Sequence, residues 1–456
     1  MATPVATDSR AEIPALGPER PVVWPPRTRA RLPNGLEIVL VESHAIPKFT
    51  GELFFRSGNA ASTATPGLAS LTSAVARTGT SARTSRQIEE DLRRMGADLS
   101  SGAGMDTSVI SFAGLSDHSE DVLRLVAELA TQATFPADEF ERERRQLLEG
   151  VRIERTTPGF LAGERMRKVL FGAHPYAAIS PTEAQVEAFR REQLVEFYKQ
   201  NYRPEDALFI AVGDFQPDAM LTQITGVFGG WSGAKPAPFA DAPLPELSGR
   251  RVYFVHLPGA VQAQVVAGNR AITRQSPDWL RYTLANSIYG GAFNSRLVMN
   301  IREQKGYTYS PRSSVHSLRR AGYFTVSAAV RNDVVAASLA EIFYELDRIR
   351  ALPVGDDELA DARNYLSGIF SLGLATQDGL AGQLASVTLE GLPEDYLEMY
   401  RQRIRALTAD DVLSAARTYF DSANMQIVVV GDREHIGHQA ALFGPVEFYD
   451  QQGNKI

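Results

Sequence analysis

The sequence predicts an α+β protein made of two tandem homologous halves, each a mostly antiparallel sheet covered by helices. Three observations support this fold class: landmarks that recur at a nearly constant offset, strand-like runs mixed with long amphipathic helices, and a Pro-rich segment near the middle of the chain. At 456 residues the chain is also too long for one compact core, so at least two domains are expected.

The repeated landmark is an apolar run that ends in Val-Gly-Asp. It reads YRPEDALFIAVGDF near the middle, where it contains Gly213, and YFDSANMQIVVVGDRE near the end, where it contains Gly431. A second landmark keeps this offset, because Pro136 and Pro353 each open a helical stretch and their separation differs from that of the two glycines by a single position. Two landmarks at nearly one spacing indicate a tandem duplication.

Hydrophobic periodicity predicts the elements within each copy. Alternating apolar and polar residues predict strands at 36–42, 107–115 and 323–330. Helical stretches at 183–201 and 408–420 precede the two Val-Gly-Asp runs. Because strands and helices do not alternate in a regular βαβ rhythm, we expect a sheet with helices packed over one face.

The domain boundaries follow from the repeat and from local composition. Residues 1–30 are rich in Pro and Ala and predict an extended arm, and 236–249 have the composition of a linker. The two domains are then expected at 31–235 and 250–456.

Composition excludes several classes of function. A net charge of −7 argues against a nucleic-acid or anionic-membrane partner, and the absence of Cys excludes disulfides, thiolate nucleophiles and Cys-ligated metals. No apolar run approaches about 20 residues, so no membrane span is expected. The missing signal peptide indicates the cytoplasm, whereas a processed form would allow the periplasm, and the compartment stays open.

A capped amphipathic helix is predicted over residues 65–80. Thr65 suits its N-cap and Gly79 suits the position past its end. At 100° per residue, the larger apolar side chains share one arc, while Ser70, Ser73 and Ala74 lie on the opposite one. Such a helix could present these three side chains to a cleft.

This segment resembles the active helix of the pitrilysin/insulinase family of zinc metallopeptidases, the inverzincins. In active members a Gly-Leu/Val-Ala lead runs into His-x-x-Glu-His, and a Gly-Thr follows. Both flanks are present here, but the three chemical positions hold Ser70, Ser73 and Ala74, and the place of the family's third ligand, further along the chain, holds Gly150. None of these can bind Zn²⁺ or take a proton from water. The resemblance therefore implies no metal and no catalytic residue in this chain.

Residues 289–310, YGGAFNSRLVMNIREQKGYTYS, resemble the family's second-half motif. In active relatives an Arg and a Tyr seven residues apart hold the substrate's backbone carbonyl near the scissile bond, and Arg302 and Tyr309 match that pair. A guanidinium and a phenol supply the fixed donors that a developing oxyanion needs. The alternative is a surface Arg beside a strand-buried Tyr. Residues 96–112 resemble the family's peptide-binding edge strand, with Ser100-Ser101 in place of Asn-Ala.

The resemblance implies a non-catalytic, substrate-binding subunit of a heterodimeric zinc metalloendopeptidase that cleaves peptides. A homologous partner with His-x-x-Glu-His would hold the zinc, and each chain would form one half-shell of a chamber. This chain would contribute Arg302 and Tyr309 and bind no cofactor of its own. Two alternatives remain: a structural scaffold with the same fold, and a peptide-binding protein without proteolysis. His435 and His438 are expected in an exposed terminal loop rather than in a metal site.

Overall fold

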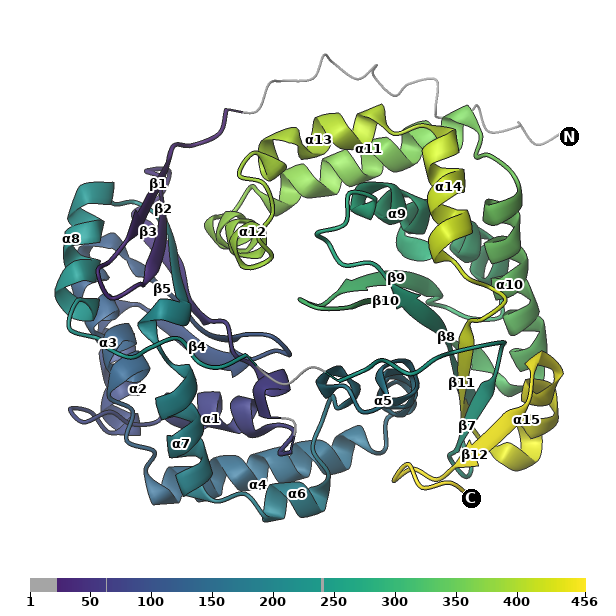
Figure 1. The fold of residues 1–456 in the computed structure, drawn as a ribbon, viewed down its shortest axis with the longest axis horizontal. Helices are drawn as coiled ribbons and strands as arrows, with labels where there is room; N and C mark the ends of the chain where they lie inside the picture. The colour runs from purple at the N-terminus through teal and green to yellow at the C-terminus, as the bar shows by residue number, and fades with distance from the viewer. Residues whose placement is uncertain (1–22, 63, 239–241) are drawn as a thin grey trace, which may run out of the picture.

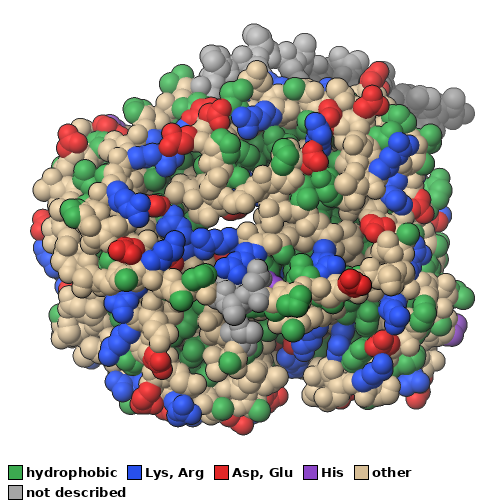
Figure 2. Space-filling view, in the orientation of Figure 1, with side chains coloured by type: hydrophobic (Ala, Val, Ile, Leu, Met, Phe, Trp, Pro, Cys, Tyr) green, Lys and Arg blue, Asp and Glu red, His purple; other side chains and the backbone are tan. Residues whose placement is uncertain are grey.

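The protein forms two similar halves around a central opening (Figures 1 and 2). The computed structural model describes residues 23–62, 64–238 and 242–456. Most of the predicted arm, residues 1–22, and residues 239–241 of the predicted linker therefore lie outside the described residues. The described part of the linker contains neither helix nor strand. Within the described residues, no helix combines the length and the apolar character that crossing a membrane requires.

The first half contains six strands and the first eight α-helices. The strands are β1 (Arg27–Arg31), β2 (Glu37–Glu42), β3 (Lys48–Phe55), β4 (Asp98–Ala103), β5 (Ser108–Leu115) and β6 (Ala207–Gly213). The helices are α1 (Leu68–Ala76), α2 (Ser85–Met95), α3 (Ser119–Thr131), α4 (Ala137–Glu154), α5 (Pro158–Phe171), α6 (Glu183–Glu187), α7 (Arg191–Asn201) and α8 (Pro217–Phe228).

The second half has a similar order, but the counterpart of β1, the strand β12, comes last instead of first. Its strands are β7 (Val252–His256), β8 (Gln262–Ala271), β9 (Arg312–Ser317), β10 (Gly322–Arg331), β11 (Gln426–Gly431) and β12 (Val446–Tyr449). Its helices are α9 (Trp279–Asn286), α10 (Val335–Ala351), α11 (Asp356–Gly373), α12 (Gln377–Leu389), α13 (Tyr396–Ala406), α14 (Ala409–Tyr419) and α15 (Arg433–Ala440), with π-helical segments at Ser287–Gly291 and Val298–Gln304.

The two sheets have closely related topologies. Their strand orders are β1-β2-β6-β3-β5-β4 and β12-β7-β11-β8-β10-β9. Only the pairs β2–β6, β7–β11 and β7–β12 are parallel among the strands of the described residues. Gly213 ends β6 and Gly431 ends β11, at equivalent places in the two sheets. The mostly antiparallel, duplicated α+β fold is confirmed.

The predicted strands agree with the structure except at their ends, whereas one predicted helix and the predicted arm differ. The three predicted strands correspond to β2, β5 and β10. The helix predicted over 183–201 is instead two, α6 and α7, because a capping box at Thr182 starts the first and the Gln193 side chain accepts from the Arg190 backbone N–H at the start of the second. The predicted arm is too long, since Arg27–Arg31 pair with β2 as an edge strand.

Helices cover both faces of each sheet, which corrects the prediction of a single covered face. The first sheet packs one face on its own helices and the other on α12 of the second half, where Leu384 contacts the cluster that contains Val41 and Ile210. The second sheet receives α5 of the first half in the same way. These helices follow α4 and α11 and occupy corresponding places in the two copies (Figure 1). Each half therefore completes the core of the other.

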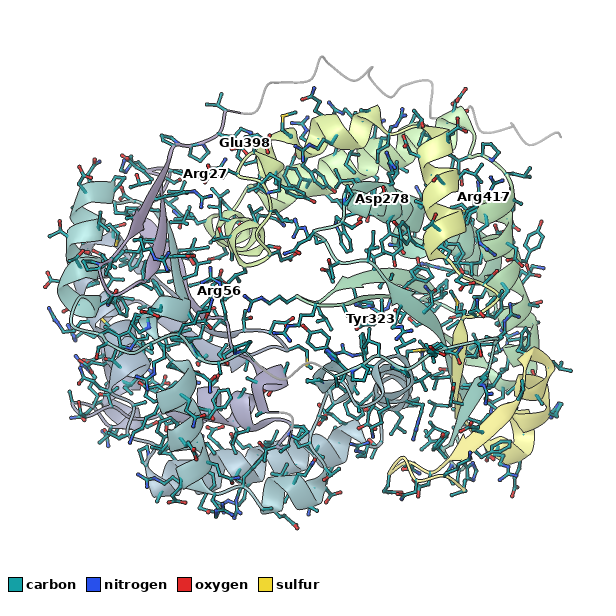
Figure 3. The ribbon with its side chains drawn as sticks, in the orientation of Figure 1. Arg27, Arg56, Asp278, Tyr323, Glu398 and Arg417 are labelled. Atoms are coloured by element: carbon teal, nitrogen blue, oxygen red, sulfur yellow. The ribbon has the colours of Figure 1, made fainter. Side chains whose placement is uncertain are left out.

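Polar contacts add to this exchange. Arg27 of β1 forms an ion pair with Glu398 of α13 (Figure 3). The Thr50 hydroxyl donates to Asp378 at the start of α12 over 2.5 Å. Arg167 of α5 donates to the Tyr323 hydroxyl of β10 over 3.2 Å. These contacts fix the two halves relative to each other across the central opening.

Candidate functional site

Helix α1, the helix expected to carry a metal site, is shorter than predicted. It begins at Leu68, with Gly67 as its N-cap at φ 85° and without a side-chain cap, and its last residue is Ala76. The prediction of Thr65 as the N-cap is wrong. A left-handed residue is needed where the chain enters the helix, and a Cβ on Gly67 would lie 2.9 Å from Pro181, so glycine suits this position.

Ser70, Ser73 and Ala74 of α1 differ in their burial. Ser73 is fully buried, and its hydroxyl lies 2.9 Å from the Tyr202 hydroxyl. Ser70 is half-buried and accepts a 2.9 Å hydrogen bond from the side chain of Asn59. Ala74 is half-buried. The prediction that all three side chains face a cleft therefore fails at Ser73, which belongs to the core.

Gly150 lies on α4, which packs against α1. A Cβ at this position would meet no atom within 4 Å, so there is room for a larger side chain that the sequence does not supply. The two hydroxyls, the methyl group and the glycine do not form a zinc site, because zinc requires imidazole, thiolate or carboxylate ligands. Among the described residues, no group of three or more His, Cys, Asp or Glu side chains could hold a metal ion.

Arg302 and Tyr309 lie side by side on the surface. Arg302 belongs to the π-helical segment Val298–Gln304, and its guanidinium is 4.6 Å from the centre of the Tyr309 ring. The ring of Phe293 lies 4.8 Å from the same guanidinium. Both aromatic rings are exposed, Tyr309 by 80% and Phe293 by 65%. Tyr309 is thus not strand-buried, and three adjacent side chains offer a cation, a phenol and an apolar surface.

The segment that carries Arg302 is held firmly from beneath. Arg296 makes a two-pronged ion pair with Glu358 of α11, with both nitrogen–oxygen distances at 2.7 Å. The Asn300 side chain donates to Glu341 and Glu345 of α10 over 2.9 Å each. Such paired contacts restrict rotation of the backbone segment. The exposed pair therefore stands on a fixed base.

The remaining candidates are the edge-strand serines and the two C-terminal histidines. Strand β4, which holds Ser100 and Ser101, is an edge strand of its sheet, as the resemblance implied. His435 and His438 both lie on helix α15 rather than in the predicted loop, and His435 is 3.3 Å from an Asp432 oxygen.

Comparisons with known proteins agree with this fold and these motifs. The family model described as Insulinase (Peptidase family M16) matches residues 37–158, and the model described as Peptidase M16 inactive domain matches residues 188–366. An uncharacterized zinc protease of Streptomyces coelicolor is 25% identical over 399 residues, which cover 85% of this chain and 86% of the relative. One of Rickettsia bellii is 22% identical, over 88% of this chain and 96% of the relative.

Solved structures show the same architecture. A peptidase M16 inactive domain from Pseudomonas fluorescens has a TM-score of 0.84 at 27% identity and covers 89% of this chain and 98% of its own. A protease from Helicobacter pylori has a TM-score of 0.83 at 18% identity, with 89% and 100% coverage. The chain belongs to peptidase family M16, and it lacks the family's catalytic motif.

Two residues of the site were not anticipated from sequence. Phe293 stands inside the second-half motif, between its glycines and Ser295, and only its position there could have drawn attention to it. Tyr202 opens the first Val-Gly-Asp landmark, and nothing in the sequence links it to Ser73.

Proposed function

We propose that this chain is the substrate-binding subunit of a two-chain zinc peptidase whose partner holds the metal. The observation that carries the proposal is the contact between Arg302 and Tyr309. Their side chains meet on a fixed surface segment, where Tyr309 is exposed and Arg302, which also pairs with Glu303 at 3.1 Å, is partly exposed. An exposed cation–aromatic group of this kind is suited to being covered by another molecule.

The chemistry follows from the donors available. A guanidinium and a phenol can both donate to a carbonyl oxygen, and their donation strengthens when the oxygen gains negative charge and water is excluded. This chain has no zinc ligands at the four family positions, so water activation would come from the partner. The proposed role of Arg302 and Tyr309 is to hold and polarise the peptide carbonyl beside that metal.

The test is reconstitution with a homologous chain that carries His-x-x-Glu-His. The mixture should cleave unfolded peptides, each chain alone should not, and a chelator should abolish cleavage. Arg302→Ala or Tyr309→Phe should lower turnover about 10²- to 10³-fold, as expected for removal of one oxyanion donor. Size-exclusion chromatography should show unchanged assembly.

A matched control is Arg86→Ala, which removes an exposed helical arginine that pairs with Glu90 over 2.7 Å. Its complex should keep full turnover. If the Arg302 and Tyr309 variants assemble and remain fully active, the assignment of the pair is wrong. If an assembled complex shows no cleavage with any peptide, a scaffold role explains the chain better.

A further inference from the structure

A cavity of about 310 Å³ lies where the two halves meet. Its wall comes from β3 and the residue after it (Glu52, Phe54, Arg56), the β9–β10 turn (Arg319) and the end of α12 (Leu389, Glu390). Figure 2 shows Lys and Arg side chains gathered beside the central opening, and Figure 3 places Arg56 next to it. We call this space the junction cavity. It is separate from Arg302 and Tyr309, which do not line it.

The acidic side of the junction cavity is incompletely neutralised. Glu52 makes no hydrogen bond or ion pair with any described residue, and one of its carboxylate oxygens is buried. Burial, and next the charge of Asp378, raise the pKa of Glu52. One oxygen of Glu390 accepts from Ser386 over 2.9 Å and lies 3.6 Å from the Arg274 guanidinium, while the other oxygen is buried without a partner among the described residues. Burying carboxylate oxygens without partners is costly, and a cationic ligand would relieve that cost at Glu52 and at the second oxygen of Glu390.

The basic side offers guanidinium groups. Arg56 is largely buried and uses one nitrogen for Glu37, at 2.7 Å. Arg319 is exposed, and its guanidinium pairs with no described carboxylate. Asp106 also lines the cavity, and its two oxygens accept from the Tyr176 hydroxyl and the Arg319 backbone N–H rather than from the guanidinium groups of Arg56 and Arg319. Arginine is well suited to bind a carboxylate.

We propose that the junction cavity binds a small zwitterion of dipeptide size. The ligand's ammonium group would pair with Glu52 and Glu390, and its carboxylate with Arg56 and Arg319. Phe54 and Leu389 supply an apolar wall for its side chains. At about 30 Å³ per water-sized group, 310 Å³ corresponds to about ten non-hydrogen atoms, close to the size of Ala-Ala. The cavity is at the small end of the range for ligand sites.

Isothermal titration calorimetry on the full chain tests the proposal. Ala-Ala should bind with a Kd of about 1 mM or tighter. N-acetyl-Ala-Ala lacks the ammonium group and Ala-Ala-amide lacks the carboxylate, so each should bind at least tenfold more weakly. Free alanine distinguishes an amino-acid site from a dipeptide site, and tight binding of either zwitterion supports the proposal.

Two variants assign the charges. Glu52→Gln should weaken Ala-Ala at least tenfold without lowering the unfolding temperature, because it removes an unpaired buried carboxyl. Arg319→Gln changes an exposed side chain, so it should fold normally and weaken Ala-Ala as well. Glu90→Gln on α2 is the matched control and should leave binding unchanged.

Three results would overturn the proposal: no binding of Ala-Ala or alanine at concentrations well above about 1 mM, equal binding of the blocked dipeptides, or undiminished binding by the folded variants. Should Glu52→Gln fail to fold, Arg319→Gln and the blocked ligands decide. The assay measures equilibrium binding to the chain alone, so its outcome is independent of the proposed peptidase role.

Discussion

Acidification should weaken the second sheet through His316 on β9, beside the exchanged helix α5. Its ring stacks on Tyr323 with centroids 4.2 Å apart, and its Nε2 lies 3.0 Å from the Thr325 hydroxyl. Burial, and then the cations Arg167 and Arg312, lower the pKa of His316 from 6.5 to about 4. The unfolded chain therefore takes up a proton that the folded protein resists. Stability is present above about pH 6.5 and is lost as pH falls toward 4.

The size of this loss follows from the two pKa values of His316. At about 1.4 kcal/mol per pKa unit, lowering the pKa from 6.5 to about 4 reduces the free energy of unfolding by about 3 kcal/mol when the protein is fully acidified. Between about pH 7 and about pH 4.5 the loss is about 2 kcal/mol. Urea unfolding at these two pH values measures it. His316→Gln cannot take up the proton, so it should lose about 2 kcal/mol less on acidification. Equal losses in the two proteins would refute the reasoning, since all other groups titrate in both.

The two Val-Gly-Asp glycines should respond differently to alanine. In thermal unfolding, Gly213→Ala should cost about 1–3 kcal/mol, because its Cβ would lie 2.4 Å from a backbone atom of β3. Gly431→Ala should cost less, because the one atom closer than 3.4 Å to its Cβ is the flexible end of the Ile436 side chain. Equal costs for the two variants would contradict this reasoning. Leu384→Ala removes a side chain that is 1% exposed and lies between the two halves, so it should lower the free energy of urea unfolding by about 2–5 kcal/mol. A negligible change would show that the packing of α12 is dispensable for stability. Phe293→Ala should lower turnover of the proposed complex about two- to fivefold, because about 0.5–1 kcal/mol of cation–π attraction to Arg302 is lost. The free energy of unfolding should not change. Steady-state kinetics measure the effect on turnover, and a larger effect or none would contradict this reasoning.

Local pattern predicted the elements well and their partners poorly. The strand at 107–115 was predicted because alternation reports one buried face directly, as in β5, whereas the strand at 36–42 became β2, which is buried on both faces. Strand β6 is buried along its whole length, and its continuous apolar run indicates burial on both faces. The sequence does not say which helix covers the second face, because the amphipathic period of α12 does not identify the sheet it packs on. The break between α6 and α7 was missed because no Gly or Pro marks it.

At the candidate site, too, local sequence predicted the positions of residues but not their contacts. Motif spacing located Ser70, Ser73 and Gly150 without the structure, since family positions are defined along the chain. The burial of Ser73 depends on Tyr202, which is distant in sequence, and such a contact leaves no local signal. The approach of Phe293 to Arg302 likewise depends on how the intervening segment folds.

The exchange of α5 and α12 has a consequence for how this architecture could have arisen. A single-copy ancestor would have had one sheet face without a cover, and swapping the helix with a second copy of itself would have covered that face. Such a protein would hold together only above a threshold concentration. Joining the two copies in one polypeptide turns that association into an intramolecular step, which no longer weakens on dilution. The duplication thereby freed the two copies to diverge, since each needs to match only one permanent neighbour.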